Sequence, residues 1–161
     1  MSSRTPTSKI AALGGALLLA ALVAAPTARA QAQDNRNAQA IKYRQSAYTV
    51  LVAQFGVMGA MVQGKMPFDA KSFQTRAQRA AFMGQILPEL FPAGSDSGAP
   101  TKAKPEIWQQ TAEFQKLMKD VQDKLAALDK AAAGGTLESV KPAFQAASQA
   151  CKACHEKYKN D

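Results

Sequence analysis

The chain has 161 residues, of which 20 are lysine or arginine and 12 are aspartate or glutamate, so its formal net charge is +8 at pH 7. Its first 30 residues carry three basic and no acidic side chains, which leaves 131 residues, the size of one domain, with a net charge of +5. This charge is small and scattered, which argues against a nucleic-acid-binding protein.

Residues 1–30 have the parts of an export signal. A basic start is followed by an apolar run over residues 10–25 and by the small-x-small sequence Ala28-Arg29-Ala30. The alternative is a membrane anchor, but the run is shorter than the ~20 residues of a spanning helix, and Pro26 follows it. We therefore expect cleavage after Ala30 and a mature domain of residues 31–161, with no later segment apolar enough to cross a membrane.

Beyond residue 30 the apolar residues recur at the spacing of amphipathic helices. We expect four helices: residues 37–63, a second capped by Asp69 and ending near Leu87, a third from Pro105 to just before Gly134-Gly135, and a fourth capped by Thr136 or Ser139. The intervening loop over residues 88–104 is longer than the ~2–8 residues usual between bundle helices. We expect it to be a plain crossover.

The first helix has an apolar seam with one charged member. Apolar residues recur every seven positions from Ile41 to Val62, and a companion row contains Arg44, Leu51 and Met58. A buried arginine needs an anionic partner. Otherwise its charged end must extend to solvent while its stem stays buried. The pattern leaves both interpretations of Arg44 open.

The last two helices have the regular seams of an antiparallel bundle. In the third, the seam advances by alternating steps of four and three residues from Ile107 to Leu128. The fourth contains Pro142, and a proline inside a helix costs ~3 kcal/mol unless it falls in the first turn. A cap at Ser139 would place it there.

The fourth seam also includes two cysteines, Cys151 and Cys154, and a histidine, His155, follows at once. Cys-x-x-Cys-His is the attachment signal of c-type haem: each thiol adds to one vinyl group, and the histidine ligates the iron. These positions share one helix face. Because the cysteines lie on the apolar seam, we expect the haem inside the bundle.

A Cys-x-x-Cys pair can also serve two other chemistries. A disulfide or thioredoxin-like redox pair should lie near a strand–helix unit, and no strand pattern precedes it. A zinc site needs a fourth ligand, but the chain contains no further cysteine or histidine. Haem c remains the favoured interpretation.

Four helices with this terminal motif resemble cytochrome c′, the class II c-type cytochromes. The resemblance rests on Lys42-Tyr43-Arg44-Gln45-Ser46, Phe55-Gly56, Pro105-Glu106-Ile107-Trp108 and Cys151-Lys152-Ala153-Cys154-His155. It implies an all-α, up-down-up-down four-helix bundle with one covalent haem c. It also implies a homodimer formed through the first two helices. The export signal adds the expectation of a periplasmic location, because bacteria attach haem c outside the cytoplasmic membrane.

The resemblance further implies the roles of individual residues. Cys151 and Cys154 would be the thioether anchors and His155 the only axial protein ligand of the iron. Four others would lie at the haem: Arg44, now favoured as a propionate partner, Gln45, Tyr48 on the distal, iron-facing side, and Lys102 in the long loop. The chain departs from the family at Lys159, where arginine is frequent, and at Pro142.

The sixth coordination position of the iron decides between functions. No methionine lies between residues 31 and 57, and Met58 is about 15 Å along the helix from Tyr48, too far to replace it over the iron. We therefore expect the other methionines to fill core or loop positions. This predicts a five-coordinate, high-spin haem whose open site binds nitric oxide or carbon monoxide.

The alternative is electron transfer to a periplasmic redox partner. Lys152, Lys157 and Lys159 surround the attachment motif, and such lysines can steer an acidic partner. They can equally complement the helix dipole. No acid–base pair or activated nucleophile accompanies the seam, so we expect no enzymatic activity.

Overall fold

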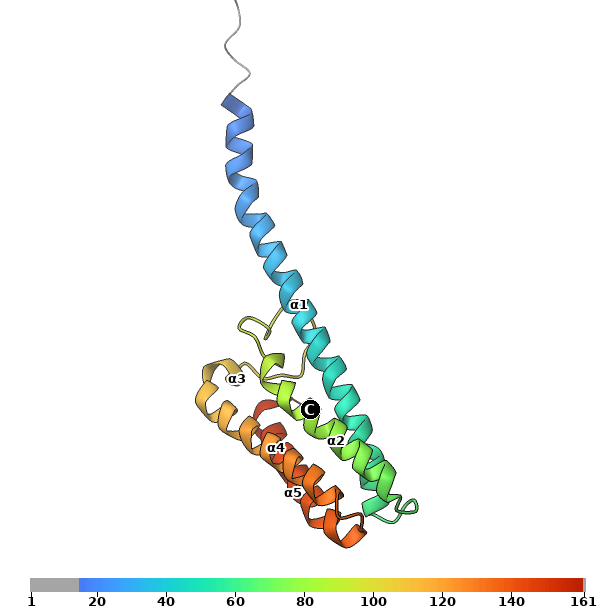
Figure 1. Cartoon of the computed structure of the whole chain (residues 1–161). Coiled ribbons are helices and arrows are strands. Elements are labelled where there is room, and N and C mark those ends of the chain that lie inside the picture. The colour runs from blue at the N-terminus through green and yellow to red at the C-terminus, as the bar shows by residue number, and fades with distance from the viewer. Residues whose placement is uncertain (1–14, 161) are drawn as a thin grey trace, which may run out of the picture.

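The computed structural model describes residues 15–160, with side chains described from residue 29. Its elements are α1 (Gly15–Val62), α2 (Ala70–Ile86), the 3₁₀ helix η1 (Leu87–Leu90), α3 (Glu106–Gln109), α4 (Thr111–Ala132) and α5 (Leu137–Tyr158). The long helices form an antiparallel bundle, with α1 extending beyond it at its N-terminal end (Figure 1). Within residues 15–160 the only β-type pairing is one isolated bridge. The expected all-α four-helix bundle is confirmed.

Helix α1 begins much earlier than the predicted start near Asn37. The preceding residues are rich in alanine, the best helix former, so the helix continues through them. Residues 29–36 are exposed, however, and Asn37 is the first buried residue. The prediction therefore located the start of packing, not the start of the helix. The predicted signal itself and its cleavage site stay predictions.

One helical stretch, Arg29–Val62, is long and apolar enough to cross a membrane when judged by length and composition alone. The expectation that no segment after the signal would pass this test was therefore wrong. A third of the relevant window is buried inside the protein. The apolar side chains of that window include the seam that faces the bundle, so its hydropathy has a structural explanation.

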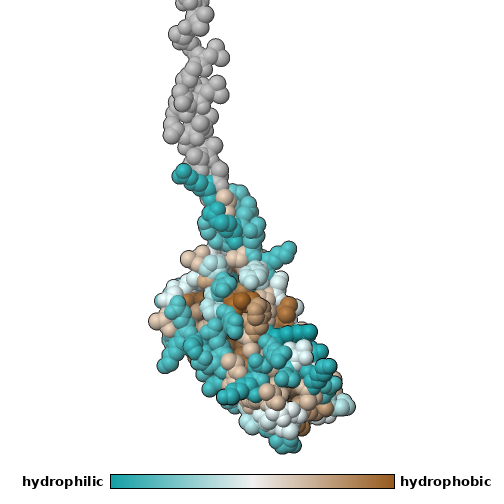
Figure 2. All heavy atoms as spheres, viewed as in Figure 1, coloured by the Kyte–Doolittle hydropathy of each residue, from teal (hydrophilic) through white to brown (hydrophobic). Residues whose placement is uncertain are grey.

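Most positions of the predicted seams form the core, whereas Thr111 is exposed and Tyr48 and Phe55 are half-buried. Buried side chains come from every long helix, including Leu51 of α1, Phe73 of α2, Leu125 of α4 and Val140 of α5. Asp69 caps α2 as predicted, accepting a hydrogen bond from the Ser72 amide at 2.9 Å. The visible surface is largely hydrophilic, with apolar residues gathered near the middle of the bundle (Figure 2).

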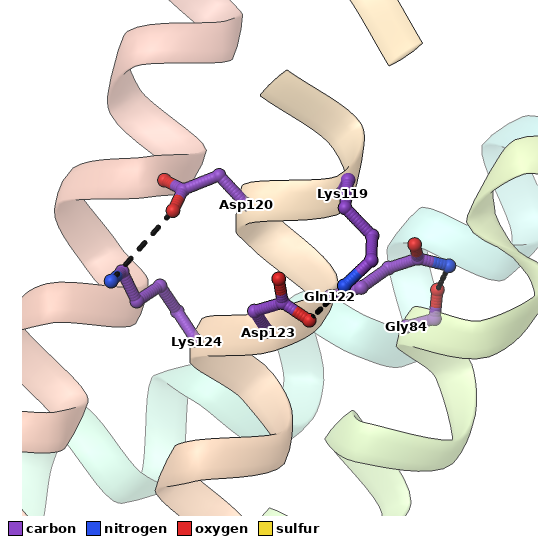
Figure 3. A network of polar contacts seen from close by, with 6 residues as sticks. All are labelled: Gly84, Lys119, Asp120, Gln122, Asp123 and Lys124. Carbon is purple, nitrogen blue, oxygen red and sulfur yellow. Dashed lines mark hydrogen bonds and ion pairs between the residues drawn. The ribbon is translucent and has the colours of Figure 1, made fainter. Parts of the chain in front are cut away.

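Helices α2 and α4 approach closely at Gly84. A Cβ atom at that position would lie 2.9 Å from Leu125 Cδ1, so only glycine fits without a shift. Gln122 Nε2 donates to the Gly84 carbonyl at 3.0 Å, which joins the helices with a polar contact (Figure 3). Figure 3 also shows the ion pairs Lys119–Asp123 and Lys124–Asp120, whose side chains lie on the exposed face of α4. Exposed pairs of this kind add only ~0.3–0.5 kcal/mol each.

The third predicted helix is interrupted. Pro105 is the N-cap of the short α3 and not its first helical residue, and Gln110 leaves the helical conformation, with φ −116° and ψ 46°. After this break α4 begins at Thr111. The short α3 buries Ile107 and places the Trp108 indole Nε1 so that it donates to the Pro92 carbonyl at 3.0 Å. Tertiary contacts with the long loop therefore accompany the break in the periodic pattern.

The N-cap of α5 is Thr136, whose Oγ1 accepts from the Ser139 amide at 3.2 Å. The alternative cap at Ser139 was wrong. Consequently Pro142 lies within the helix, beyond its first turn. It cannot donate to the Glu138 carbonyl, but both residues are exposed, so water can satisfy that oxygen.

Candidate haem site

The site lies between α1 and α5. Helix α4 packs extensively against α5 and α2, whereas α1 and α5 contact each other at few positions. A cavity of about 540 Å³, here called the α1–α5 cavity, lies between them. Its walls come from both helices and from two short segments: Tyr48, Leu51, Val52, Phe55, Lys104, Ser148, Cys151, Lys152, His155, Glu156, Lys159 and Asn160.

Helix α5 contributes the attachment motif. Cys151 and His155, one helical turn apart, line the cavity, while Cys154 is buried with 8% of its surface exposed. Both thiols are free, and burial raises the pKa of Cys154 to about 11 and that of Cys151 in the same direction. Burial, followed by the charge of Lys159, lowers the pKa of His155. That shift favours the neutral imidazole, the form that ligates metals.

Tyr48 lines the opposite wall. Its ring packs edge-on against Phe91, with centroids 6.3 Å apart. Burial raises the pKa of its phenol, and the nearby Cys154 and Cys151 thiols act in the same direction. The hydroxyl therefore stays protonated near neutral pH. Tyr48 and the attachment motif are brought to one cavity, as the predicted distal position requires.

Arg44 does not line the cavity. Only 4% of its surface is exposed, so the interpretation in which its charged end reaches solvent is wrong. Its guanidinium donates to the Leu90 and Ser95 carbonyls and to the Ser95 and Thr101 hydroxyls, at 2.9–3.3 Å. Burial lowers its pKa. The contact with a haem propionate stays a prediction.

Two other predicted haem contacts lie outside the cavity lining. Gln45 Nε2 donates to the Pro100 carbonyl at 2.9 Å, and Lys102 is exposed with its carbonyl accepting from the Asn160 amide at 2.8 Å. Lys104, two residues further on, does line the cavity. Sequence reasoning missed it, because position in a long loop cannot be counted reliably. The only feature of the sequence that could have indicated Lys104 as a cavity residue is its position directly before Pro105.

The methionines occupy the predicted kinds of position. Met58, Met61 and Met118 are buried in the core, and none of the five methionines between residues 29 and 160 lines the cavity. Met66 is exposed in the turn after α1. That no methionine replaces Tyr48 at the iron stays a prediction.

The cavity fits a c-type haem. Its volume is within the ~300–1,000 Å³ typical of cofactor sites. One wall presents the apolar side chains of Leu51, Val52 and Phe55, suited to a flat hydrophobic ring. The other presents a free thiol and an imidazole one turn apart. Separation of α1 from α5 in an otherwise packed bundle is the space that such a ring requires.

Comparison with known proteins agrees with this geometry. The model of the family described as "Cytochrome C'" matches residues 39–159. The chain belongs to the cytochrome c′ family. It is 38% identical over 131 residues to cytochrome c′ of Rubrivivax gelatinosus, covering 79% of this chain and 98% of that protein. Members of the family carry covalently bound haem c, and haem c is the cofactor of this chain.

Two solved structures are similar throughout the bundle. Cytochrome c prime from Shewanella frigidimarina is 45% identical, with a TM-score of 0.74, covering 78% of this chain and 97% of that one. A nitric oxide complex of a mutant cytochrome c prime from Alcaligenes xylosoxidans is 32% identical, with a TM-score of 0.72 and coverages of 78% and 97%. A mutant of one relative with the same fold is therefore known in complex with nitric oxide.

Proposed function

We propose that this protein is a periplasmic cytochrome c′ that binds nitric oxide and carbon monoxide at the open distal side of its haem, in gas binding or nitrosative protection. The observation that carries the proposal is the composition of the α1–α5 cavity, in which Tyr48, and no methionine, faces the attachment motif. The nitric oxide complex of the Alcaligenes relative supports the choice of ligand.

Each residue of the cavity has a role in this proposal. Cys151 and Cys154 would hold the haem and His155 would ligate its iron, which would offer a coordination position to a diatomic gas. Leu51 and Phe55 provide an apolar wall that excludes water. Tyr48 restricts access and offers the one phenolic hydroxyl in the cavity lining. A small uncharged gas is the ligand that such a guarded, apolar space admits.

The optical spectrum of the reduced mature protein, with and without carbon monoxide, tests the proposal. We expect a broad high-spin spectrum that sharpens when the gas is added. A sharp low-spin spectrum that does not respond to carbon monoxide or nitric oxide would refute it. In that case the sixth ligand would come from the protein, and the lysines that line the cavity, Lys104, Lys152 and Lys159, would be the candidates.

Access past Tyr48 is testable by substitution. Tyr48→Ala should increase the rate of carbon monoxide association, about tenfold if moving the ring supplies ~1.4 kcal/mol of the barrier. Tyr43→Ala is the matched control, because Tyr43 lies on the same helix but is 52% exposed. Equal rates in all three proteins would show that Tyr48 does not guard the site.

Electron transfer is the second candidate function, favoured by lysines at the rim of the cavity. Lys104, Lys152 and Lys159 line it, and Lys152 is partly neutralised by Glu156 at 3.5 Å. Lys157, predicted to belong to this group, instead pairs with Glu113 outside the cavity lining. If an acidic redox partner docks here, Lys104→Gln with Lys159→Gln should slow reduction and flatten its salt dependence. Lys116→Gln with Lys119→Gln on α4 is the control.

The cellular location and the assembly are also proposals. Export predicts a mature protein whose mass corresponds to cleavage after Ala30. A homodimer through α1 and α2 would cover two exposed apolar residues on those helices, Val50 and Phe82, the latter 63% exposed. Phe82→Asp should then shift sedimentation from dimer to monomer. A wild-type monomer would refute the assembly without affecting gas binding.

We also propose that the protein is not an enzyme. The cavity lining contains a single carboxylate, Glu156, which is exposed and paired with Lys152. That pairing makes it a poor general base. Hydrogen peroxide turnover well above that of an equal amount of free haem would contradict this proposal.

A further inference from the structure

The loop expected to be a plain crossover is anchored along its whole length. Residues 91–104, here called the strap, run from η1 to α3 and contact α1 first. A Cβ atom at Gly98 would lie 3.0 Å from both Asn37 Cβ and the Asp34 carbonyl oxygen, and Gly98 has φ +101°. A Cβ atom at Gly94, which has φ +83°, would lie 3.2 Å from both the nitrogen and the oxygen of the Asn37 side-chain amide. Only glycine suits these two contacts, so the strap is seated on the start of the packed part of α1.

Arg44 is the main polar anchor of the strap. Its Nη1 donates to the Ser95 hydroxyl at 3.0 Å and its Nη2 donates to the Ser95 carbonyl at 2.9 Å and to the Thr101 hydroxyl at 3.0 Å. Ser95 is completely buried. The guanidinium also lies over the rings of Phe91 and Trp108, at 4.9 and 5.6 Å from their centroids. One side chain of α1 therefore fixes the middle and the end of the strap.

The C-terminal end of the strap holds the end of α5. Ala103 and Lys159 form an antiparallel bridge, flanked by hydrogen bonds from the Lys104 amide to the Tyr158 carbonyl at 3.0 Å and from the Asn160 amide to the Lys102 carbonyl at 2.8 Å. The Thr101 hydroxyl, which accepts from Arg44, also accepts from the Ala103 amide at 3.1 Å. The connection from Arg44 to the bridge is therefore continuous.

The bridge lies beside the haem ligand. The Lys159 amide donates to the His155 carbonyl at 3.0 Å, which closes the last turn of α5. Lys104, Lys159 and Asn160 all line the α1–α5 cavity. A strap fixed at Arg44 thus determines where the rim of the cavity lies relative to His155, although Arg44 itself is not in the cavity lining.

We propose that Arg44 is a positioning residue: through the strap it fixes Lys104 and the C-terminal end of α5 at the rim of the haem cavity. The inference rests on the haem site but not on which gas binds there. The positioning role requires an arginine at position 44 for a geometric reason. Four acceptors and two aromatic faces surround a planar group with five donors, whereas a lysine ammonium has three donors and no plane.

Hydrogen exchange of backbone amides tests the proposal on the haem-loaded protein. The amides of Lys104 and Asn160 report on the bridge, and those of Leu125 and Leu128 report on the core. Arg44→Lys should increase exchange at the two bridge amides about tenfold or more while leaving the core amides unchanged, because only local opening becomes easier. The matched control is Arg36→Lys, an exposed arginine on the same helix whose side-chain partner is Gln33.

A second variant separates this role from a direct contact with the haem. Thr101→Val removes the hydroxyl that accepts from Arg44 and from Ala103 but leaves α1 intact, and it should increase exchange at the same two amides. If Arg44→Lys shifts the reduction potential while both bridge amides stay protected, Arg44 acts on the haem directly and the proposal is overturned. Unchanged protection of the two bridge amides in Thr101→Val overturns the proposal as well. If Arg44→Lys does not hold haem, the result with Thr101→Val is the one that tests the proposal. The gas response of the wild-type spectrum tests the proposed function independently.

Discussion

Two regions of this molecule are held together in different ways. Around Phe73, Leu125 and Leu128 the bundle is packed by fully buried apolar side chains from α2 and α4. At the α1–α5 cavity the two helices separate, and the segments around it are held together by the strap, the buried Arg44 and a single bridge from Ala103 to Lys159. Apolar packing is non-directional and sets how the helices align. Hydrogen bonds are directional, and here they set where the rim of the site lies.

The largest effect expected is loss of the cofactor from the cavity region. Replacing both thiols, Cys151→Ser with Cys154→Ser, should abolish covalent haem attachment, because no sulfur remains to form a thioether. Serine is close to cysteine in size and the other core side chains are unchanged, so most of the helical circular dichroism should remain. Haem staining after denaturing electrophoresis measures the first effect. Ser148→Ala, at another cavity position on α5, should keep its haem.

The core region should respond through stability instead. Leu125→Ala should lower the free energy of unfolding by ~2–5 kcal/mol, since Leu125 is fully buried. Gly84→Ala should cost ~1–3 kcal/mol, because its methyl group would lie 2.9 Å from Leu125 Cδ1. Denaturant unfolding of the single and double variants forms a cycle. The loss of unfolding free energy in the double variant should be smaller than the sum of the two single losses, because the shortened side chain at position 125 leaves room for the added methyl group. Additive losses would show that the close contact with Leu125 is not what makes Gly84→Ala unfavourable.

Pro142 offers a stabilising change at the end of α5 remote from the attachment motif. Pro142→Ala should raise the free energy of unfolding by up to ~3 kcal/mol, because alanine restores the amide that the Glu138 carbonyl lacks. Lys141→Ala, at the exposed neighbouring position, should change it by much less. Thermal unfolding measures both. The carbon monoxide spectrum should be identical in all three proteins, which would confirm that the two regions are energetically separable.

The smallest effect expected is a pH dependence from Tyr48. Burial raises the pKa of this phenol in the folded protein, so above its ordinary value of 10.0 the unfolded chain loses the proton first. Stability is therefore unaffected by this group below about pH 10 and falls as the pH rises further, by at most ~1.4 kcal/mol per pH unit. Tyr48→Phe should reduce this fall, and Tyr43→Phe should not. An unchanged slope in Tyr48→Phe would show that the phenol is not desolvated.

Much of the bundle could be predicted because periodicity reports burial directly. The positions of Leu51, Phe114, Val140 and Cys154 follow from steps of three and four residues, and all are buried. The helix boundaries were harder to predict, because a helix ends where contacts with other segments are more favourable than its own backbone hydrogen bonds. The break at Gln110 accompanies the contacts of α3 with the strap, and the start of α1 reflects alanine content that has no bearing on packing.

The chemistry of this protein can be predicted from the chain alone, because haem attachment needs two thiols and a histidine within five consecutive residues, Cys151 to His155, and local spacing is visible in a chain. Which residues share the cavity with them depends on the fold. Lys104 and Lys159 are 55 positions apart in the chain and both line the cavity, next to the bridge between Ala103 and Lys159. Arg44 is buried among partners up to 57 residues away. Contacts between distant segments depend on how loops close, and no periodic pattern records that.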